Sequence, residues 1–334
     1  PGLPVFSPGL PGNRISMPRK RILLICGSLN QTTMMHQISR HLQHHDCCFT
    51  PYYSDGFIET LRKAGLLEFT ILGGRARQRT EQYLSQHRLP VDYAGTGHPY
   101  DLVYTCSDLI VPVNIRQKNI VLVQEGMTDP ESMVYRLTRA LGLPRYLANT
   151  SMTGLSHAYR KFCIASEGHK ELFRQKGIPE DKMEVTGIPN FDHAEQYRIN
   201  DFPYRNYLLV ATSHLRETWK YENRKRFLRQ AQVLSDGRPI IFKLHPNENV
   251  LRARREIQRW APGHLVLQQG NTNHMIANCE ALVTRYSSVL LTARALGKPI
   301  HWDLENEFIR KLTPLQTGGT SARRIARIGE SFLE

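Results

Sequence analysis

The sequence predicts an α/β protein with two Rossmann-like (flavodoxin-like) parallel-sheet domains that face one another across a cleft. Short apolar runs alternate with amphipathic stretches along the chain, a pattern typical of parallel sheets covered by helices. The 334 residues suit two domains of ordinary size, each with its own core. A stretch with little periodicity at 187–205 interrupts the alternation, which then begins again, so we place the domain boundary there.

The chain divides into five segments. Residues 1–16 are rich in Pro and Gly, contain no Lys and lack the basic start and apolar block of a signal peptide, so we expect a leader or a disordered tail. We then expect an N-terminal domain over 17–190, a linker over 191–205 and a C-terminal domain over 206–318. The last segment, 319–334, is predicted to be a helix that crosses back onto the N-terminal domain.

Apolar runs mark the expected strands, and amphipathic stretches mark the expected helices. In the first half we expect strands at 21–26, 47–53, 101–105, 119–123, 161–165 and 183–186, and helices from the loop at 27–33 to about residue 44 and at 57–64, 75–87 and 167–176. In the second half we expect strands at 207–211, 239–243, 264–267, 281–284 and 299–303, and helices at 221–234, 249–260, 273–279, 288–296 and 321–334. Open parallel sheets bind ligands beyond the carboxyl ends of their strands, so the loops that follow the strands hold the candidate site residues.

Composition limits the class of protein. Apolar residues make up 40% and charged residues 22%, as in globular domains, and no apolar run reaches the roughly 18 residues of a membrane span. The six cysteines form no CxxC pair, which favours reduced thiols in a cytoplasmic protein over disulfides or a zinc site. The net charge of +14 fits nucleic acid, anionic lipid headgroups or phosphorylated ligands, and charge alone does not decide among them.

A phosphate seat is predicted where the loop Arg285-Tyr286-Ser287-Ser288 joins a strand to a helix. The backbone N–H groups of a helix start, together with two hydroxyl groups, suit a phosphate. An ordinary serine N-cap is the alternative interpretation.

Residues 283–299 (VTRYSSVLLTARALGKP) resemble the late motif of two families, the UDP-N-acetylglucosamine 2-epimerases and the CDP-glycerol glycerophosphotransferases. Further segments resemble epimerase motifs in the same order, at 107–108, 123–127, 185–190, 211–217 and 244–250. Both families share the glycosyltransferase-B fold, so the resemblance implies this fold for about residues 20–300. It does not specify the reaction.

The chain also departs from the epimerase pattern. Leu291 and Thr292 stand where the resemblance places a Glu that holds the ribose diol. The His that precedes the family's Glu-Ala-Gly segment is missing before Glu125-Gly126, and its Pro-Glu-Glu segment is echoed only by Pro130-Glu131. These departures put a UDP ligand in question and favour a transferase.

Three residues are candidates for proton transfer. Glu125 and Asp108 follow strands of the first half, where either carboxylate could act as general base for a sugar hydroxyl, or could be only a solvated strand end. His214 follows a strand of the second half and could act as acid or base near neutral pH. In each case we expect the side chain to face the cleft if it takes part in the reaction.

Other polar residues are candidates for ligand binding. Arg216 and His245 are expected to hold the diphosphate with Tyr286, Ser287 and Ser288, although the His245 ring could instead pin its loop. For the sugar or acceptor, the candidates are Ser28, Asn30, Gln31 and Glu131. The loop that holds the first three could also be only a helix cap. No metal is expected, because the spaced pair His41 and His45 has no obvious acidic or Cys partner and is interpreted as a solvated helix face.

The leading functional hypothesis is a transferase that moves a sugar or polyol phosphate from a nucleotide-diphosphate donor in the C-terminal domain to an acceptor in the N-terminal domain. The alternatives are an epimerase similar to the UDP-N-acetylglucosamine 2-epimerases and a non-catalytic nucleotide-sugar binding protein. No cofactor is expected. The partners would be a nucleotide sugar and an acceptor such as a lipid-linked or cell-surface glycan, with peripheral association at the inner face of the membrane, in the synthesis of cell-envelope polysaccharide. Nucleic acid is disfavoured, because no aromatic-rich basic strand accompanies the charge.

Overall fold

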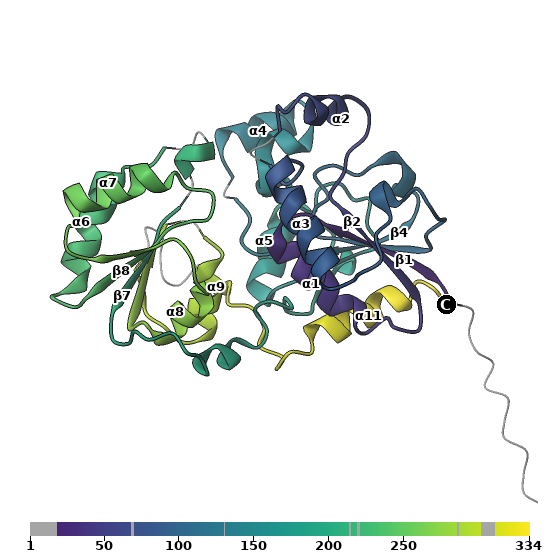
Figure 1. The fold of residues 1–334 in the computed structure, drawn as a ribbon. Coiled ribbons are helices and arrows are strands. Elements are labelled where there is room, and N and C mark those ends of the chain that lie inside the picture. Colours follow the sequence, from purple (N-terminus) through teal and green to yellow (C-terminus); the bar gives the residue numbers. More distant parts are fainter. Residues whose placement is uncertain are drawn as a thin grey trace, which may run out of the picture.

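The computed structural model describes residues 19–67, 70–129, 131–213, 215–218, 221–285, 287–301 and 311–334, apart from the side chains of residues 75 and 218. The predicted leader at 1–16 lies outside these ranges. Two α/β units lie side by side, each with a parallel sheet between helices (Figure 1). The predicted α/β class and the two parallel sheets are therefore confirmed.

The first sheet has six parallel strands in the order β2-β1-β3-β4-β5-β6. The four inner strands are almost entirely buried, because helices cover both faces of the sheet, which explains why these strands read as apolar runs. The strands are β1 (Arg21–Cys26), β2 (Asp46–Pro51), β3 (Leu102–Thr105), β4 (Asn119–Val123), β5 (Lys161–Ile164) and β6 (Met183–Val185). The α-helices of this half are α1 (Leu29–Ser39), α2 (Gly56–Lys63), α3 (Gly74–Gln86), α4 (Met133–Ala140) and α5 (Glu167–Gln175).

The second sheet has five parallel strands in the order β11-β10-β7-β8-β9. The order reverses between β7 and β10, and such a switch point is where open parallel sheets leave a crevice for ligands. The strands are β7 (Leu208–Ala211), β8 (Ile240–Lys243), β9 (Leu265–Leu267), β10 (Ala281–Thr284) and β11 (Ile300–His301). The helices are α6 (Arg224–Ser235), α7 (Val250–Trp260), α8 (Thr272–Asn278) and α9 (Val289–Ala295).

Short 3₁₀ turns complete both halves. They are η1 (Tyr93–Gly95), η2 (Val113–Ile115), η3 (Arg145–Met152) and η4 (Glu180–Lys182) in the first half, η5 (Ala194–Arg198) in the link, and η6 (Leu215–Thr218) after β7.

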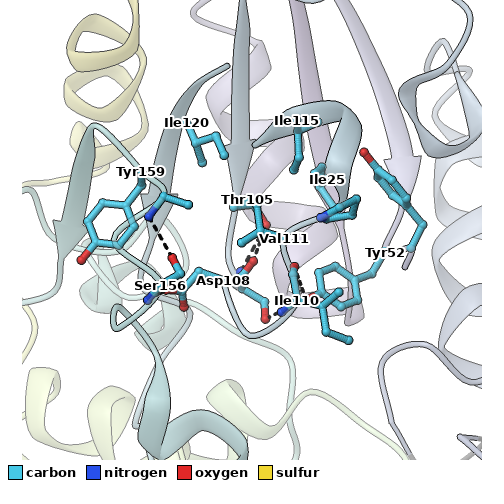
Figure 2. A pocket seen from close by; sticks show the side chains of 14 residues that line it. Ile25, Tyr52, Thr105, Asp108, Ile110, Val111, Ile115, Ile120, Ser156 and Tyr159 are labelled. Atoms are coloured by element: carbon cyan, nitrogen blue, oxygen red, sulfur yellow. Dashed lines mark hydrogen bonds between the residues drawn. The ribbon is translucent and has the colours of Figure 1, made fainter. Parts of the chain in front are cut away.

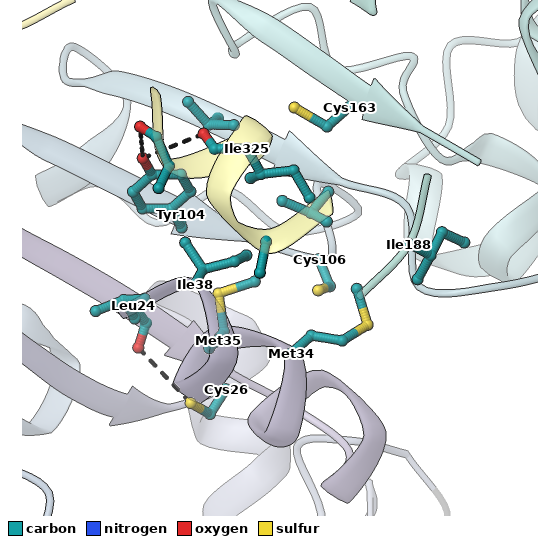
Figure 3. Packing of buried hydrophobic residues seen from close by; sticks show 14 of the residues in the cluster. Leu24, Cys26, Met34, Met35, Ile38, Tyr104, Cys106, Cys163, Ile188 and Ile325 are labelled. Carbon is teal, nitrogen blue, oxygen red and sulfur yellow. Dashed lines mark hydrogen bonds between the residues drawn. The ribbon is translucent and has the colours of Figure 1, made fainter. Parts of the chain in front are cut away.

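The last helix, α11 (Ser321–Glu330), returns to the first domain. Ile325 lies in the core cluster that also contains Ile38 of α1 and Tyr104 of β3 (Figure 3). The Tyr104 hydroxyl donates a hydrogen bond to the Ala326 carbonyl oxygen at 3.0 Å. Gly329 is required for this approach, because a Cβ there would lie 2.0 Å from the Tyr104 hydroxyl oxygen. The chain therefore ends on the domain in which it began.

The two domains share part of their cores. Leu291 of α9 belongs to the apolar cluster of the first domain, although α9 covers the second sheet. Met127, in the loop after β4, packs against the clusters of both domains. The loops at the carboxyl ends of the two sheets are therefore packed against each other.

Several sequence expectations need correction. The first helix ends at Ser39, five residues before the predicted end, and Arg40 is its C-cap. The helix α4 was not predicted, although Met133, Val134, Leu137 and Leu141 recur at helical spacing. The expectation of cysteines without disulfides holds, because all six are free. Among the described residues, no helix is long and apolar enough to cross a membrane.

Candidate functional site

The carboxylate of Glu125 lies in a nest of neutral hydrogen-bond donors. The Ser28 hydroxyl donates to its Oε1 at 2.6 Å, and the Gln31 amide donates to its Oε2 at 2.5 Å. A third donor is the Asn30 amide, whose Nδ2 is 3.4 Å from Oε1. Three predicted sugar-binding residues and one predicted base therefore meet at a single point.

Local backbone chemistry explains this convergence. Ser28 is the N-cap of α1, and its Oγ accepts a hydrogen bond from the Gln31 backbone N–H at 3.2 Å. Its hydroxyl proton is thus left for Glu125. Gly27 has no side chain, and a Cβ there would lie 2.0 Å from Oε1 of Gln31. The glycine therefore makes room for Gln31 to reach the carboxylate.

The last residue of the N-terminal domain, next to the interdomain link, is tied to the same helix start. Asn190 donates from Nδ2 to Oδ1 of Asn30 at 2.5 Å and to the Thr33 hydroxyl at 3.0 Å. Its own Oδ1 accepts from the Gln37 amide at 2.6 Å. A change in the angle between the domains would therefore act directly on a residue that contacts Glu125.

Gly126 brings this loop against the second domain. A Cβ at Gly126 would lie only 3.2 Å from Cβ of Ser288, which is the N-cap of α9. Behind it, the buried Gln124 side chain donates to the Gly126 carbonyl at 2.8 Å and accepts from the Ala165 N–H at 2.9 Å. Gln124 thus fixes the backbone that carries Glu125.

Asp108 has a different environment. It is 2% exposed, and its two carboxylate oxygens accept backbone N–H bonds from Gly154 at 2.9 Å and from Ser156 at 3.0 Å. Figure 2 shows it beneath apolar side chains that include Ile115 and Ile120. They line a cavity of about 10 Å³, roughly the space of one water molecule. Asp108 therefore holds a loop in place, and its carboxylate has no open side for a substrate hydroxyl.

The corresponding edge of the second sheet carries a network of Arg and Glu side chains. Arg224 is 3% exposed, and its guanidinium contacts Glu222 at 2.8 Å and Glu248 at 2.5 Å. The strand-end hydroxyls join it, because Ser213 donates to Glu222 at 2.9 Å and Thr212 donates to Glu248. Burial raises the pKa of Glu248, and Arg224 opposes this shift by stabilising the ionised form.

Arg216 belongs to the same network. It donates to both carboxylate oxygens of Glu256, at 2.7 Å and 2.8 Å, and these bonds raise its pKa. Glu222 and Glu248 lie within 4 Å of the same guanidinium. Its neighbour Glu217 pairs with Arg252 of α7. The predicted diphosphate ligand Arg216 is therefore already held by carboxylates.

The remaining predicted residues are dispersed. His245 accepts the Asn247 backbone N–H on its Nδ1 at 3.1 Å, which matches the interpretation of a ring that pins its loop. Ser287 and Ser288 begin α9 beside Gly126, with Val289 N–H 3.5 Å from the Ser287 hydroxyl. Glu131 is exposed and precedes α4. His214 and Tyr286 lie outside the described residues.

Three residues with structural importance at these edges were missed by the sequence analysis. Gln124 and Asn190 lie within segments that resemble family motifs, so their place in those motifs was an available signal. Arg224 stands at the first position of a helix rich in exposed basic residues, and nothing in the sequence separates it from them.

One group in the described part of the chain has the composition of a metal site. His44 and His45 lie 2.6 Å and 3.6 Å from Oε1 of Glu330, so the acidic partner that was not apparent in the sequence comes from α11. The His45 Nδ1 accepts the Lys20 N–H at 3.4 Å, so Nε2, which faces Glu330, carries the proton of the neutral ring. The group therefore lies between α11 and the turn that precedes β2, far from the carboxyl edge.

Comparisons with known proteins identify the fold. No family model matches the sequence, and no curated protein sequence matches it. Among solved structures, UDP-GlcNAc 2-epimerase from Neisseria meningitidis, bound to UDP-GlcNAc, matches with a TM-score of 0.56 at 15% identity, over 92% of this chain and 99% of that chain. MnaA from S. aureus with UDP gives 0.58 at 12% identity, over 94% and 97%.

A third solved structure is a variant of the wall teichoic acid polymerase TagF soaked with CDPG, with a TM-score of 0.53 at 11% identity, over 94% of this chain and 89% of that chain. Identities this low establish similarity of fold and leave the reaction open. The chain has the two-domain glycosyltransferase-B type architecture that the sequence predicted.

Proposed function

We propose that this chain is a transferase that moves a sugar or polyol phosphate from a nucleotide-diphosphate donor to a hydroxyl acceptor. The observation that carries the proposal is the Glu125 nest, in which one carboxylate is held by neutral donors at the carboxyl edge of the first sheet. Glu125 is the general base, and it takes the proton of the acceptor hydroxyl as that oxygen bonds to the transferred group. For a sugar, the bond from its anomeric carbon to the diphosphate breaks, and the nucleoside diphosphate leaves with the bonding electrons. For a polyol phosphate, the P–O bond within the diphosphate breaks, and the nucleoside monophosphate leaves with them.

The donor is assigned to the loop after β10, at the switch point of the second sheet. Ser287 and Ser288 supply hydroxyl groups there, and Ser288 lies against Gly126, next to the base. This contact supports a reaction between the two edges. Arg216 and Asp108 are not assigned to ligand binding or proton transfer, since the Arg216 guanidinium is paired with Glu256 and both carboxylate oxygens of Asp108 accept backbone N–H bonds.

An epimerase is the second candidate, because the Neisseria meningitidis structure reported above is a UDP-GlcNAc 2-epimerase. Elimination and readdition of a nucleotide need carboxylates placed around the sugar and its leaving group. Leu291 is 1% exposed and packs into the first domain's core, while the Thr292 hydroxyl lies 3.1 Å from the Asn273 side chain. Neither position offers a carboxylate to a ribose, which favours the transferase.

Nucleotide binding is the first test. At 100 times its dissociation constant, a ligand adds about 2.7 kcal/mol to the free energy of unfolding. We expect UDP or CDP to raise the melting temperature, with inorganic phosphate at the same concentration giving a much smaller shift. If no nucleoside diphosphate changes the melting temperature, the proposed donor site is wrong.

An incubation with nucleotide sugar in deuterated water then distinguishes an epimerase, a transferase and a non-catalytic binding protein. An epimerase exchanges the hydrogen at the reacting sugar carbon with solvent, so mass spectrometry of recovered UDP-N-acetylglucosamine would show one added deuterium. A transferase returns the donor without deuterium and releases nucleotide only when its acceptor is present. Tight binding with neither outcome across an acceptor panel would favour the non-catalytic alternative.

A further inference from the structure

The outer surface of α4 and the turn after it is apolar. Most apolar side chains in this segment are exposed, including Met133 at 85% and Leu141 at 63%. We name the exposed apolar residues of the segment the α4 face: Met133, Val134, Leu137, Leu141, Leu143 and Leu147. A soluble surface seldom gathers so many large apolar side chains on one short segment, and such a patch indicates an interaction site.

The α4 face is not needed to hold the helix on the protein. The opposite side of α4 is buried through Tyr135, which packs with Ala148 and Met152 in a small separate cluster. Ser132 caps the helix by accepting the Tyr135 N–H at 3.3 Å. The helix therefore has its own inward anchor and N-cap, and its outward apolar residues have no packing role among the described residues.

The charged residues within the segment that carries the α4 face are all arginines. Residues 133–147 contain three arginines and no Asp or Glu. Arg136 and Arg139 are exposed on α4 itself, whereas Arg145 is half-buried. Just before the helix, Glu131 is exposed, and Asp129 accepts a hydrogen bond from the Thr150 hydroxyl. The whole chain carries a net charge of +14.

We propose that the α4 face docks onto an anionic lipid bilayer. A short helix with apolar and basic side chains on its outer surface can lie in the plane of a membrane interface, with its apolar residues among the acyl chains and its cations near the headgroups. The exposed Phe57 belongs to α2, which lies at the same end of the first domain in Figure 1. The bilayer contact is peripheral.

Charge favours lipid over a second copy of the chain. A two-fold contact would place the same patch against itself, so the arginines of one copy would face those of the other with no acid from residues 133–147 between them. An anionic leaflet instead neutralises each arginine that approaches it. The surface begins eight residues after Glu125, so docking would bring the first domain's site near the membrane.

Vesicle binding tests the proposal without any nucleotide, and its outcome is therefore independent of the proposed reaction. The full chain is sedimented with vesicles of pure phosphatidylcholine and with vesicles that contain phosphatidylglycerol as well. We expect at least tenfold stronger binding to the anionic vesicles, and loss of most of that binding in high salt.

Variants then locate the contact. The double change Leu137→Asp with Leu141→Asp is expected to weaken binding at least tenfold, and Arg136→Gln and Arg139→Gln by about fivefold each. The matched controls are Arg226→Gln with Arg229→Gln, and Val233→Asp, at exposed positions on α6 in the other domain. The controls should bind as the parent chain does.

Three results would overturn the inference. They are equal binding to both kinds of vesicle, a loss of binding in the α6 controls as large as in the α4 variants, or no vesicle binding at all. Light scattering tests whether a second copy of the chain covers the α4 face instead. If the parent chain is a dimer that does not bind vesicles, and Leu137→Asp makes it a monomer, the α4 face is a dimer interface. Circular dichroism of each variant checks that the variant is folded, so that weaker vesicle binding is not caused by unfolding.

Discussion

The carboxyl edges of the two sheets occupy equivalent places in the fold and use charge in opposite ways. At the first edge, Glu125 is surrounded by a hydroxyl and two amides, and among the described residues no Arg or Lys donates to it. At the second edge, Arg224 and Arg216 are enclosed by Glu222, Glu248 and Glu256. The carboxylate at the first edge is therefore hydrogen-bonded by neutral groups, whereas the arginines at the second edge are paired with carboxylates of the protein.

This difference decides which residues are free to act on a ligand. A neutral donor can exchange one hydrogen bond for another as a substrate enters, at small cost. A buried guanidinium that leaves its carboxylates exposes uncompensated charge, which costs several kcal/mol. A basic residue at a strand end is thus weak evidence of an anion site until its partners are known, as Arg216 illustrates.

The largest expected effect comes from changing Glu125 to Gln. The amide keeps the shape of the side chain and cannot accept a proton, so turnover should fall by about 10² to 10⁴. Nucleotide affinity should change little, because the donor is assigned to the other domain. The measurement is a steady-state rate together with a binding isotherm for the same folded variant.

A matched control for Glu125→Gln is Asp129→Asn, a nearby carboxylate whose contact is with Thr150. It should leave turnover within a factor of about two. Full activity in Glu125→Gln would show that the nest only shapes a loop, and the comparison between the two edges would then lose its functional meaning.

A change in the Arg and Glu network at the second edge should lower the stability of the protein and not its activity directly. Arg224→Ala leaves Glu222 and Glu248 buried without their main cation, and we expect a loss of about 3–5 kcal/mol in the free energy of unfolding. Arg226→Ala, on the exposed side of the same helix, should cost less than about 0.5 kcal/mol. Urea unfolding of both variants makes the comparison, and equal losses would contradict a structural network.

The sequence predicted the sheets well because buried parallel strands leave an unambiguous signal. The strands β1, β4 and β10 have the predicted bounds. The meeting of Ser28, Asn30 and Gln31 with Glu125 also follows in part from topology, since their loops leave the same edge of one sheet. The strand β3 separates β1 from β4 in that sheet, so the two loops are not immediate neighbours. The contact with Glu125 therefore also depends on the length of the side chains and on the space that Gly27 leaves for Gln31.

The rest depends on interactions that a linear pattern does not encode. Arg216 and Glu256 are 40 positions apart, and no spacing rule pairs them. The buried state of Asp108 depends on where the backbone of Gly154 and Ser156 returns. Apolar spacing in 133–141 indicated a helix, but the pattern could not show that its apolar side faces outward, which only the burial of Tyr135 and exposure of Leu137 reveal.

A smaller effect is expected at the proposed donor loop. Ser287→Ala with Ser288→Ala removes two hydroxyl groups from the start of α9 and should weaken nucleotide binding by about 1–3 kcal/mol, the range for hydrogen bonds to a charged group. Titration calorimetry with the nucleotide that gives the largest thermal shift is the measurement. Thr272→Ala, at the start of α8, is the control. Unchanged affinity in the folded double variant would place the phosphate elsewhere.

The smallest effect tests whether the two edges act as one site. Gly126→Ala adds a Cβ that would lie 3.2 Å from Cβ of Ser288, so the two loops must move apart there by a few tenths of an ångström. The change in unfolding free energy should stay below about 1 kcal/mol, because reduced chain entropy in the unfolded state offsets part of the crowding.

The loss of turnover, expressed as an activation free energy, should be larger than this change in unfolding free energy, since the base and the donor loop no longer approach fully. Ser288→Gly removes the opposing Cβ together with a hydroxyl of the proposed donor loop, so the double variant should lose less activity than the sum of the two single losses, with a coupling of at least about 0.5 kcal/mol in a double-mutant cycle. Strictly additive effects would mean that the two loops touch without acting together, and the site would then belong to one domain alone.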